Sequence, residues 1–265
     1  MNILAKCGRV IDEFRINGEC VEFKVFGKGH INSTFLVSFK NSENKITKYV
    51  IQIINTHVFP EPDKLMDNII RVTDFLRAKE PQNRGILNMI RTKNGDGFYR
   101  DADGKCWRMY VYVDNALSLE SVGLPDDFYE AAFAFGKFQR DLSDFPADTL
   151  YEIIPNFHNT EKRYQDFLDA VERDIQGRAA SIKEEIEFIK NRADFYGLLN
   201  KKYAEGVIPL RVTHNDTKLN NVLLDKKTRK ALCVLDLDTI MPGFSITDFG
   251  DAIRFGANTA AEDEK

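Results

Sequence analysis

Side chains that can hold a cation or move a proton are concentrated in residues 210–238, which read LRVTHNDTKLNNVLLDKKTRKALCVLDLD. Amide oxygens and carboxylates are hard ligands that suit Mg²⁺, which prefers a few carboxylates together with the phosphates of a substrate. Asn and Asp are also common turn residues, so an isolated cluster would indicate only a loop. The candidate groups are an imidazole, an amide and three carboxylates: His214, Asn221, Asp216, Asp236 and Asp238.

Two short strands joined by a polar turn are expected directly after the loop of this segment. If Asp225 pairs with Ala231, an antiparallel register places Asn221 opposite Leu235, beside Asp236. Directly opposed residues in such a hairpin have Cβ atoms roughly 4.5–5.5 Å apart. The register therefore predicts that an amide oxygen and a carboxylate meet at one end of the hairpin, close to the carboxylate in the loop.

The spacing within the segment matches an arrangement found in protein kinases. The pattern His-x-Asp-x-x-x-x-Asn is followed by a hairpin with an aspartate at the end of its second strand. Protein kinases have a catalytic-loop aspartate, an asparagine five residues later and a metal-binding aspartate that closes a hairpin, in this same order. The segment therefore predicts phosphoryl transfer with magnesium as the cofactor.

The first part of the chain is predicted to be rich in strands. Residues 21–54 alternate apolar and polar side chains in three runs, which predicts three antiparallel strands. A helix is expected after Pro62, where apolar residues recur at helical spacing. Turn sequences at 94–97 and 101–104 bracket short strands, the last of them at 107–113. We expect a five-strand sheet with one helix.

The second part of the chain has helical periodicity. Three apolar stripes, which begin at Phe128, Tyr164 and Ile182, are each expected to pack on a core. The fold class is therefore α+β, a bilobal, protein-kinase-like fold with a small antiparallel β-sheet N-lobe and a mainly helical C-lobe. The expected boundaries are 1–113 for the nucleotide-binding N-lobe, with a hinge to about residue 115, and 116–265 for the C-lobe with the catalytic loop. Ligands commonly bind in the cleft between two such parts.

Composition excludes several classes of protein. The 265 residues include 37 Lys and Arg against 41 Asp and Glu, a net charge of −4 without a basic block, which disfavours nucleic-acid binding. No stretch approaches the roughly 18 apolar residues of a membrane helix, and residues 1–15 lack the apolar core of a signal peptide. The four cysteines form no Cys-x-x-Cys pair, which argues against a zinc site or a disulfide framework. We expect a soluble, cytoplasmic protein that binds neither nucleic acid nor membrane, and the oligomeric state is not indicated.

Gly27 and Gly29 lie between the first two expected strands. A two-glycine turn most often marks only a hairpin. It also fits a loop over the phosphates of a nucleotide, where glycine lets the backbone approach closely. The next residue, His30, is equally consistent with a contact to phosphate or sugar and with a capping role in the hairpin.

Several motifs together resemble the phosphotransferases related to aminoglycoside and choline kinases. The similarity lies in HNDTKLNN, VLDLDTIMPG and DFGDAIRFGAN, and it extends to FGKGHINSTFLV, YVIQIINTHVF and FHNT. These motifs are particularly similar to the N-acetylhexosamine 1-kinase branch, whose members phosphorylate the anomeric hydroxyl of a sugar with ATP. The resemblance covers nearly the whole chain. Because members of that branch continue well beyond the position of Lys265, it implies an incomplete C-lobe and acceptor site.

The resemblance implies roles for the loop and the hairpin. Asp216 matches the residue that accepts the proton of the substrate hydroxyl, and Asn221 and Asp236 match the magnesium ligands. Asp238 is expected to be an additional ligand or to lie just outside the ligand shell. Lys218 is expected to reach the transferring phosphate, and a solvated loop lysine is a nearly equal alternative.

Two further residues are expected to have structural roles. His214 matches a histidine that mainly holds the loop. Asp248 begins the sequence DFG, which spells the metal motif of protein kinases. It lies 32 residues after Asp216 and does not close the hairpin, so we expect a cap or a brace for the loop. Asp236 has the better claim to the metal.

For the nucleotide, the resemblance implies contacts from the glycine turn, from His30 and Asn32 of the GHIN sequence, and from Gln52. Gln52 stands where protein kinases have the lysine of the third strand, and a neutral amide can hydrogen-bond a phosphate but supplies no charge. The hexosamine kinase branch resembles this chain in lacking that lysine. The countercharge is then left to magnesium and Lys218, and the adenine is expected at the hinge, residues 109–115.

The predicted function is an ATP-dependent sugar kinase that phosphorylates the anomeric hydroxyl of an N-acetylhexosamine or a related sugar. A kinase for another small alcohol, such as an aminoglycoside, choline or a homoserine-like acceptor, is an alternative, and a cationic acceptor would require an acidic pocket. A nucleotide-binding pseudokinase is an alternative from another class. The missing lysine favours the pseudokinase, whereas Asp216, Asn221 and Asp236 argue against it.

Overall fold

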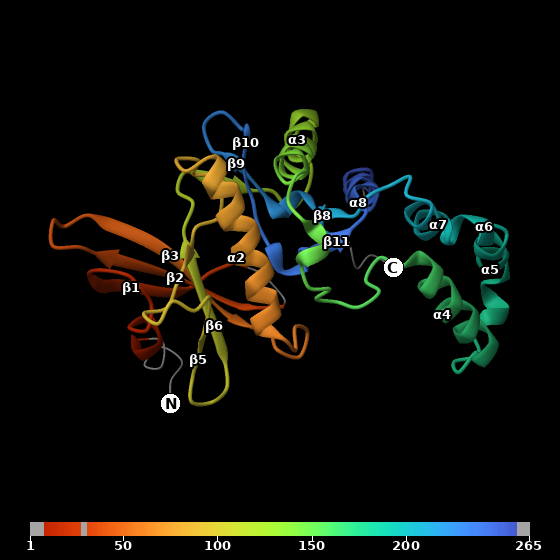
Figure 1. Ribbon diagram of the computed structural model, residues 1–265, viewed down its shortest axis with the longest axis horizontal. Helices are drawn as coiled ribbons and strands as arrows, with labels where there is room; N and C mark the ends of the chain where they lie inside the picture. Colours follow the sequence, from red (N-terminus) through yellow and green to blue (C-terminus); the bar gives the residue numbers. More distant parts are fainter. Residues whose placement is uncertain (1–7, 28–30, 259–265) are drawn as a thin grey trace.

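The computed structural model describes residues 8–27 and 31–258, and its largest element is a six-stranded antiparallel sheet (Figure 1). The strand order is β1-β2-β3-β6-β4, and β5 pairs with β6 off this path. The three strands predicted within residues 21–54 are confirmed. The strands are β1 (Glu19–Val25), β2 (Ser33–Lys40), β3 (Ile46–Ile54), β4 (Met89–Ile90), β5 (Tyr99–Arg100) and β6 (Cys106–Val111).

This sheet has one strand more than the sequence predicted. β4 and β5 have two residues each, which is too short for apolar alternation to show. β6 ends at Val111 rather than at residue 113. Alternating residues of the central strands, among them Val37, Ile51 and Trp107, are fully buried in one cluster, which fixes the register of the sheet.

Helix α2 (Pro62–Lys79) connects the sheet to the second part of the molecule. Proline stands at its start, where a missing N–H is tolerated. Its fully buried Asn68 donates to the carbonyl oxygens of Tyr151 (2.8 Å) and Ile240 (2.9 Å) and accepts from the N–H of Tyr151 (2.9 Å). α2 is thereby tied to the chain just after the predicted metal-binding hairpin.

The second part is mainly helical, as predicted. The stripe that begins at Ile182 spans two helices rather than one, with a break at residues 191–192. The expectation that the stripe from Tyr164 packs on a core is wrong, because α4 has no buried residue and Tyr164 stacks on Tyr196 at 4.8 Å and on Phe167 at 6.4 Å between centroids. In Figure 1, α4 to α7 lie at the end of the molecule farthest from β1. The helices are α3 (Pro125–Asp141), α4 (Thr160–Arg173), α5 (Lys183–Lys190), α6 (Ala193–Tyr196), α7 (Leu198–Ala204) and α8 (Ser245–Gly256).

Two small sheets between the helices hold the loops of the predicted site. Their strand orders are β10-β9-β7 and β11-β8. The 3₁₀ turns η3 (Leu219–Asn221) and η4 (Leu237–Thr239) come directly before β9 and soon after β10. No helix in the described part of the chain is long and apolar enough to span a membrane. The strands are β7 (Ala116–Ser118), β8 (Arg211–Thr213), β9 (Val222–Asp225), β10 (Ala231–Val234) and β11 (Met241–Gly243).

Candidate active site

The β9-β10 hairpin forms, but not with the predicted pairing at its turn. Ala231 lies opposite Leu224 rather than Asp225, so the predicted register is wrong at this end. A β-bulge between Ala231 and Cys233 then adds one residue to the second strand. The bulge shifts every later pair by one position.

Beyond the bulge the register is the predicted one. The N–H of Leu235 donates to the carbonyl oxygen of Asn221 over 2.7 Å, so Asn221 lies beside Asp236 in space. Leu232 lies within the bulge, and its carbonyl oxygen packs against Gly85, where a Cβ atom would lie 2.0 Å from that oxygen. Position 85 therefore has no room for a side chain.

His214 is fully buried and bonded through both ring nitrogens. Its Nε2 lies 2.8 Å from the carbonyl oxygen of Leu235, and the N–H of Asp216 donates to Nδ1 over 3.3 Å. Because a carbonyl oxygen only accepts, the proton belongs on Nε2. The ring packs edge-on against Phe135, with centroids 5.2 Å apart. His214 thus holds the loop against the hairpin, as predicted.

Two carboxylates of α8 hold the backbone of the same loop. Asp248 is 2% exposed and accepts from the N–H groups of His214 (2.9 Å) and Asn215 (2.8 Å). Asp251 accepts from the N–H of Thr217 over 2.8 Å. The loop-bracing role predicted for Asp248 is confirmed, and it explains why DFG in this chain serves the loop rather than closing the hairpin.

Asn221 and Asp216 are in direct contact. The side-chain nitrogen of Asn221 donates to the carbonyl oxygen of Asp216 (2.8 Å) and to its Oδ2 (3.0 Å). Lys218 Nζ lies 3.6 Å from Asp216 Oδ1, and 29% of the Asp216 side chain is exposed. The Asp216 carboxylate is therefore oriented by the amide and is still accessible to a substrate.

Asp236 has an unusual backbone and an unusual carboxyl group. Its φ of 54° lies in the left-handed region, which is strained for a residue with a Cβ atom. The residue as a whole is exposed, yet protein atoms crowd its carboxyl group. Burial, followed by repulsion from Asp238, raises the pKa of Asp236 to about 6. Such a carboxylate is ionised at neutral pH but poorly compensated by the protein.

The donor set fits a magnesium ion. No described residue donates a hydrogen bond to the Asp236 carboxylate or to the side-chain oxygen of Asn221, so both remain available as ligands. No three His, Cys, Asp or Glu side chains gather as a closed metal cage in residues 8–27 and 31–258. An open site of this kind suits Mg²⁺, which takes its other ligands from water and substrate phosphates.

Asp238 is buried, and protein donors occupy both of its oxygens. Arg108 Nη1 and Nη2 bond to Oδ1 and Oδ2, the second over 3.0 Å, and Asn32 Nδ2 donates to Oδ2 over 2.7 Å. Burial acts to lower the pKa of Arg108, but Asp238 outweighs it and the pKa is raised. Asp238 thus accepts from three protein donors, and its expected place, as an additional metal ligand or just outside the ligand shell, stays a prediction.

The amides predicted to contact the nucleotide are engaged within the protein. Gln52 Oε1 accepts from Arg108 Nε, and Gln52 Nε2 donates to Thr34 Oγ1, both over 2.9 Å. Asn32 Oδ1 accepts from the N–H of Asn55 over 2.9 Å. Their nucleotide contacts stay predictions, and neither amide is held out toward solvent.

The glycine turn is described only in part. Gly27 has a φ of +79°, a conformation that glycine adopts at little cost. Gly29 and His30 lie outside the described residues, so their predicted contacts stay predictions.

Sequence reasoning missed Arg108. The signal was present, because it is the only charged residue in the run CWRMYV, which otherwise reads as a fully buried strand. A buried guanidinium requires an anionic partner. In the structure that partner is Asp238 of the VLDLD motif.

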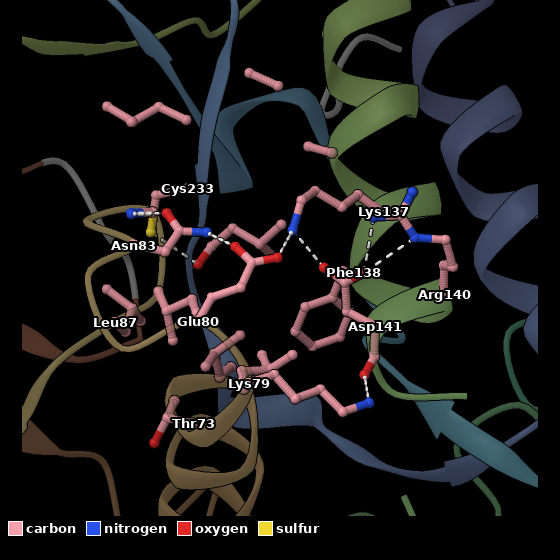
Figure 2. Close-up of a pocket in the computed structure, with 18 of the residues that line it drawn as sticks. Thr73, Lys79, Glu80, Asn83, Leu87, Lys137, Phe138, Arg140, Asp141 and Cys233 are labelled. Atoms are coloured by element: carbon pink, nitrogen blue, oxygen red, sulfur yellow. Dashed lines mark hydrogen bonds and ion pairs between the residues drawn. The ribbon is translucent and has the colours of Figure 1, made fainter. Parts of the chain in front are cut away.

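The cavity shown in Figure 2 is not lined by the predicted site residues, although Leu237, between Asp236 and Asp238, forms part of its wall. It has a volume of about 390 Å³ and opens between α2, α3 and β10. Lys137 pairs there with Glu80 at 3.0 Å and also with Asp141. Burial raises the pKa of the Cys233 thiol in its wall to about 12, so the thiol is unreactive at neutral pH. None of the predicted site residues lines this cavity.

An aspartate oriented by an asparagine five residues later, a hairpin that leads to a second aspartate, and an antiparallel sheet define a phosphotransferase of the kinase-like type. Residues 22–264 match the phosphotransferase enzyme family, APH, and the chain belongs to this family. It is therefore an enzyme, a small-molecule phosphotransferase.

Solved structures with the same fold include several antibiotic kinases. The GDP complex of aminoglycoside 2'-phosphotransferase-IIIa is 14% identical with a TM-score of 0.61, and the match covers 96% of this chain and 79% of that one. An aminoglycoside phosphotransferase from Alicyclobacillus acidocaldarius is 13% identical with a TM-score of 0.58, over 93% and 70% of the two chains. Amicoumacin kinase hAmiN, in complex with AMP-PNP, Ca²⁺ and Ami, is 11% identical with a TM-score of 0.56, over 99% and 75%. The mixed α/β fold with its antiparallel sheet agrees with these structures.

Proposed function

We propose that the enzyme transfers the γ-phosphoryl group of ATP to a hydroxyl group of a small molecule, and that the acceptor is the anomeric hydroxyl of an N-acetylhexosamine or a related sugar. The observation that supports phosphoryl transfer most directly is the Asp216–Asn221 contact. It leaves one accessible carboxylate for the acceptor and one amide oxygen for a cation, beside Asp236.

In this proposal Asp216 accepts the proton of the acceptor hydroxyl as the oxygen attacks phosphorus. An anomeric hydroxyl is more acidic than an ordinary alcohol, so a carboxylate is an adequate acceptor. The Asn221 amide fixes the direction of the carboxylate, and His214 fixes the loop that carries it. Most of the rate enhancement then comes from positioning and charge stabilisation rather than from the proton transfer itself.

Asn221 and Asp236 would hold Mg²⁺, and the ion would neutralise charge on the phosphates. Lys218, next to Asp216, is placed to reach the transferring phosphate in the same proposal. We also propose a bilobal arrangement, in which residues 1–113 bind the nucleotide, a hinge extends to about 115, and the remaining residues form a lobe that carries the catalytic loop.

The acceptor is tested with a panel of free hexoses and N-acetylhexosamines in the presence of magnesium and ATP. Phosphorus NMR of the product distinguishes an anomeric phosphate, which is a hemiacetal ester, from a phosphate on another hydroxyl. An anomeric phosphate is the expected result. Transfer only to another hydroxyl, or no transfer to any sugar, would contradict the proposed acceptor.

Aminoglycosides and related antibiotics form a second acceptor class to include in the panel. The structures of similar fold carry such acceptors in their names, among them a spectinomycin phosphotransferase in complex with ADP and its antibiotic. Transfer to an aminoglycoside but not to a sugar would keep the phosphotransferase reaction and replace the acceptor.

A further inference from the structure

The cation that is absent from the third strand of this enzyme is present on the neighbouring strand. Gln52 on β3 lies directly opposite Arg108 on β6, and Arg108 Nε donates to Gln52 Oε1 over 2.9 Å. The Arg108 side chain is 5% exposed, so its charge is enclosed in the protein. Gln52 therefore positions this guanidinium in the middle of the sheet.

Arg108 joins the sheet to the turn that follows β10. Its two terminal nitrogens bond to the two oxygens of Asp238, which is 4% exposed and belongs to η4. Asp238 lies two residues after Asp236, whose strained left-handed backbone starts this turn. A two-pronged guanidinium–carboxylate contact fixes orientation as well as distance, which a lysine cannot do.

The residue Asn32, which follows the glycine turn, is bonded to the same carboxylate. Asn32, just before β2, donates to Asp238 Oδ2 over 2.7 Å and accepts from the N–H of Asn55 over 2.9 Å. Asp238 is thus bonded to two parts of the six-stranded sheet. Arg108 connects it to the central strands, and Asn32 connects it to the segment after the glycine turn.

A buried ion pair of this kind is weak evidence for stability, because the cost of removing two charges from water can exceed their attraction. Its best-attested use is to specify one arrangement of the groups that carry it. Here that arrangement includes the backbone of Asp236. The carboxylate of Asp236 accepts no hydrogen bond from any described residue.

We propose that Arg108 is a positioning residue for the magnesium–nucleotide site, acting through Asp238, and that Asp238 is its anchor rather than a metal ligand. The inference rests on the proposed function in one respect, that the ligand of the site is a magnesium–nucleotide complex. It goes beyond that function because it gives a positioning role to a buried guanidinium on β6, directly opposite the position on β3 where the lysine is absent.

The test compares ADP binding by calorimetry in excess magnesium and in EDTA, for the wild type, Arg108→Lys and Arg108→Met. Arg108→Met should lower the affinity for ADP in magnesium at least tenfold and the affinity in EDTA less than threefold. Arg108→Lys keeps the charge but loses the second prong, so its affinity in magnesium should lie between those of the wild type and Arg108→Met. Circular dichroism of each variant shows whether the fold is retained.

Arg91→Met is the matched control. It removes another arginine–aspartate pair, a more exposed one that joins Arg91, just after β4, to Asp74 of α2 at 2.7 Å and includes no predicted site residue. It should change neither affinity. If Arg108→Met does not fold, Arg108→Lys and Asp238→Asn carry the test, and each should lose affinity in magnesium selectively.

The outcomes separate this inference from the proposed function. Equal losses in magnesium and in EDTA, or no loss in a folded Arg108→Lys variant, would show that Arg108 serves the fold alone. Wild-type protein that binds ADP in neither condition would overturn the proposed function itself, and the inference with it. Wild-type binding without the selective loss overturns only the inference.

Discussion

The side-chain amide of Asn221 donates to two oxygens of Asp216, the backbone carbonyl and one carboxylate oxygen, at 2.8 and 3.0 Å. This contact uses only the nitrogen of the Asn221 amide and leaves its oxygen without a described partner. Its nitrogen orients the carboxylate that would face the acceptor in the proposed function, and its oxygen would bind the cation. One side chain thus orients the predicted proton acceptor and also carries a predicted metal-ligand oxygen.

Asp216→Asn should reduce kcat by at least about 10²-fold, the lower end of the range for a positioned general base. The variant preserves the shape of the side chain but cannot accept the proton. The affinity for ATP should change little, because an interaction made chiefly in the transition state does not affect ground-state binding. Single-turnover phosphoryl transfer and ATP calorimetry measure the two effects. Loss of both together would show that Asp216 holds the metal or the fold.

Asp236→Asn should abolish turnover and weaken nucleotide binding in magnesium, while binding in EDTA stays nearly unchanged. The reason is that in the proposed function the Asp236 carboxylate would supply charge to the cation, and it accepts no hydrogen bond from any described residue. Calorimetry with ADP in the two conditions measures this. An unchanged magnesium dependence would place the metal on other carboxylates.

The same substitution should stabilise the protein without metal at neutral pH. The pKa of Asp236 is raised from 3.8 to about 6, so the folded state disfavours the ionised form. The corresponding stability is fully present below about pH 4 and is lost as the pH rises through about 6. Asp236→Asn cannot ionise, so its melting temperature in EDTA should exceed that of the wild type at pH 7.5 and match it near pH 4. Equal melting temperatures at both pH values would contradict the raised pKa.

Binding of magnesium–ADP to the wild type should weaken below about pH 6. A metal ligand must lose its proton to bind, so a carboxyl group with a pKa of about 6 makes the metal compete with a proton. For one such group the affinity should fall by up to about tenfold per pH unit below that pKa. Asp236→Asn is the control, and its residual affinity should lack this pH dependence. A flat profile for the wild type between pH 7 and 5 would disprove the coupling.

Asp248→Ala should lower the free energy of unfolding by at least about 2 kcal/mol, because it leaves buried donors without an acceptor. The donors are the backbone N–H groups of His214 and Asn215 and the side chain of Gln139. Urea denaturation measures the loss. The neighbouring Phe249→Ala is the matched control, since Phe249 is 67% exposed and its removal should cost little. Equal stabilities of the two variants would disprove the bracing role.

The sequence was sufficient for the elements with strong periodicity and for the order of the chemical groups. The first three strands, α2 and the Asn221–Leu235 neighbourhood follow from local pattern. The turn of the hairpin was not predictable, because a bulge depends on backbone geometry that no residue type in 231–233 specifies. Strands of two residues are formed by their partners, so β4 could not be recognised, whereas β5 was indicated only by the turn sequences on either side of it.

The hydrogen bonds around Asp238 could not be predicted from the sequence for a different reason. Arg108 lies 130 residues from its carboxylate partner, and Asn32 lies 206 residues from it. Local pattern identifies a buried charge that needs a partner, but it does not say which of the chain's acids supplies it. Only the packing of the sheet against η4 selects Asp238.

The bulge in β10 has a consequence for changes in chain length. The bulge restores the register from Cys233 onward. Two one-residue offsets in the hairpin therefore cancel: one in the pairing at the turn, and one from the extra residue in β10. A one-residue deletion in the turn at 226–230 could be absorbed by straightening the bulge, with Asn221 still opposite Leu235. Straightening would also withdraw the Leu232 carbonyl from Gly85 and make room for a side chain there. Relatives with a shorter turn are thus expected to tolerate residues other than glycine at position 85, so that loop length and a distant glycine vary together.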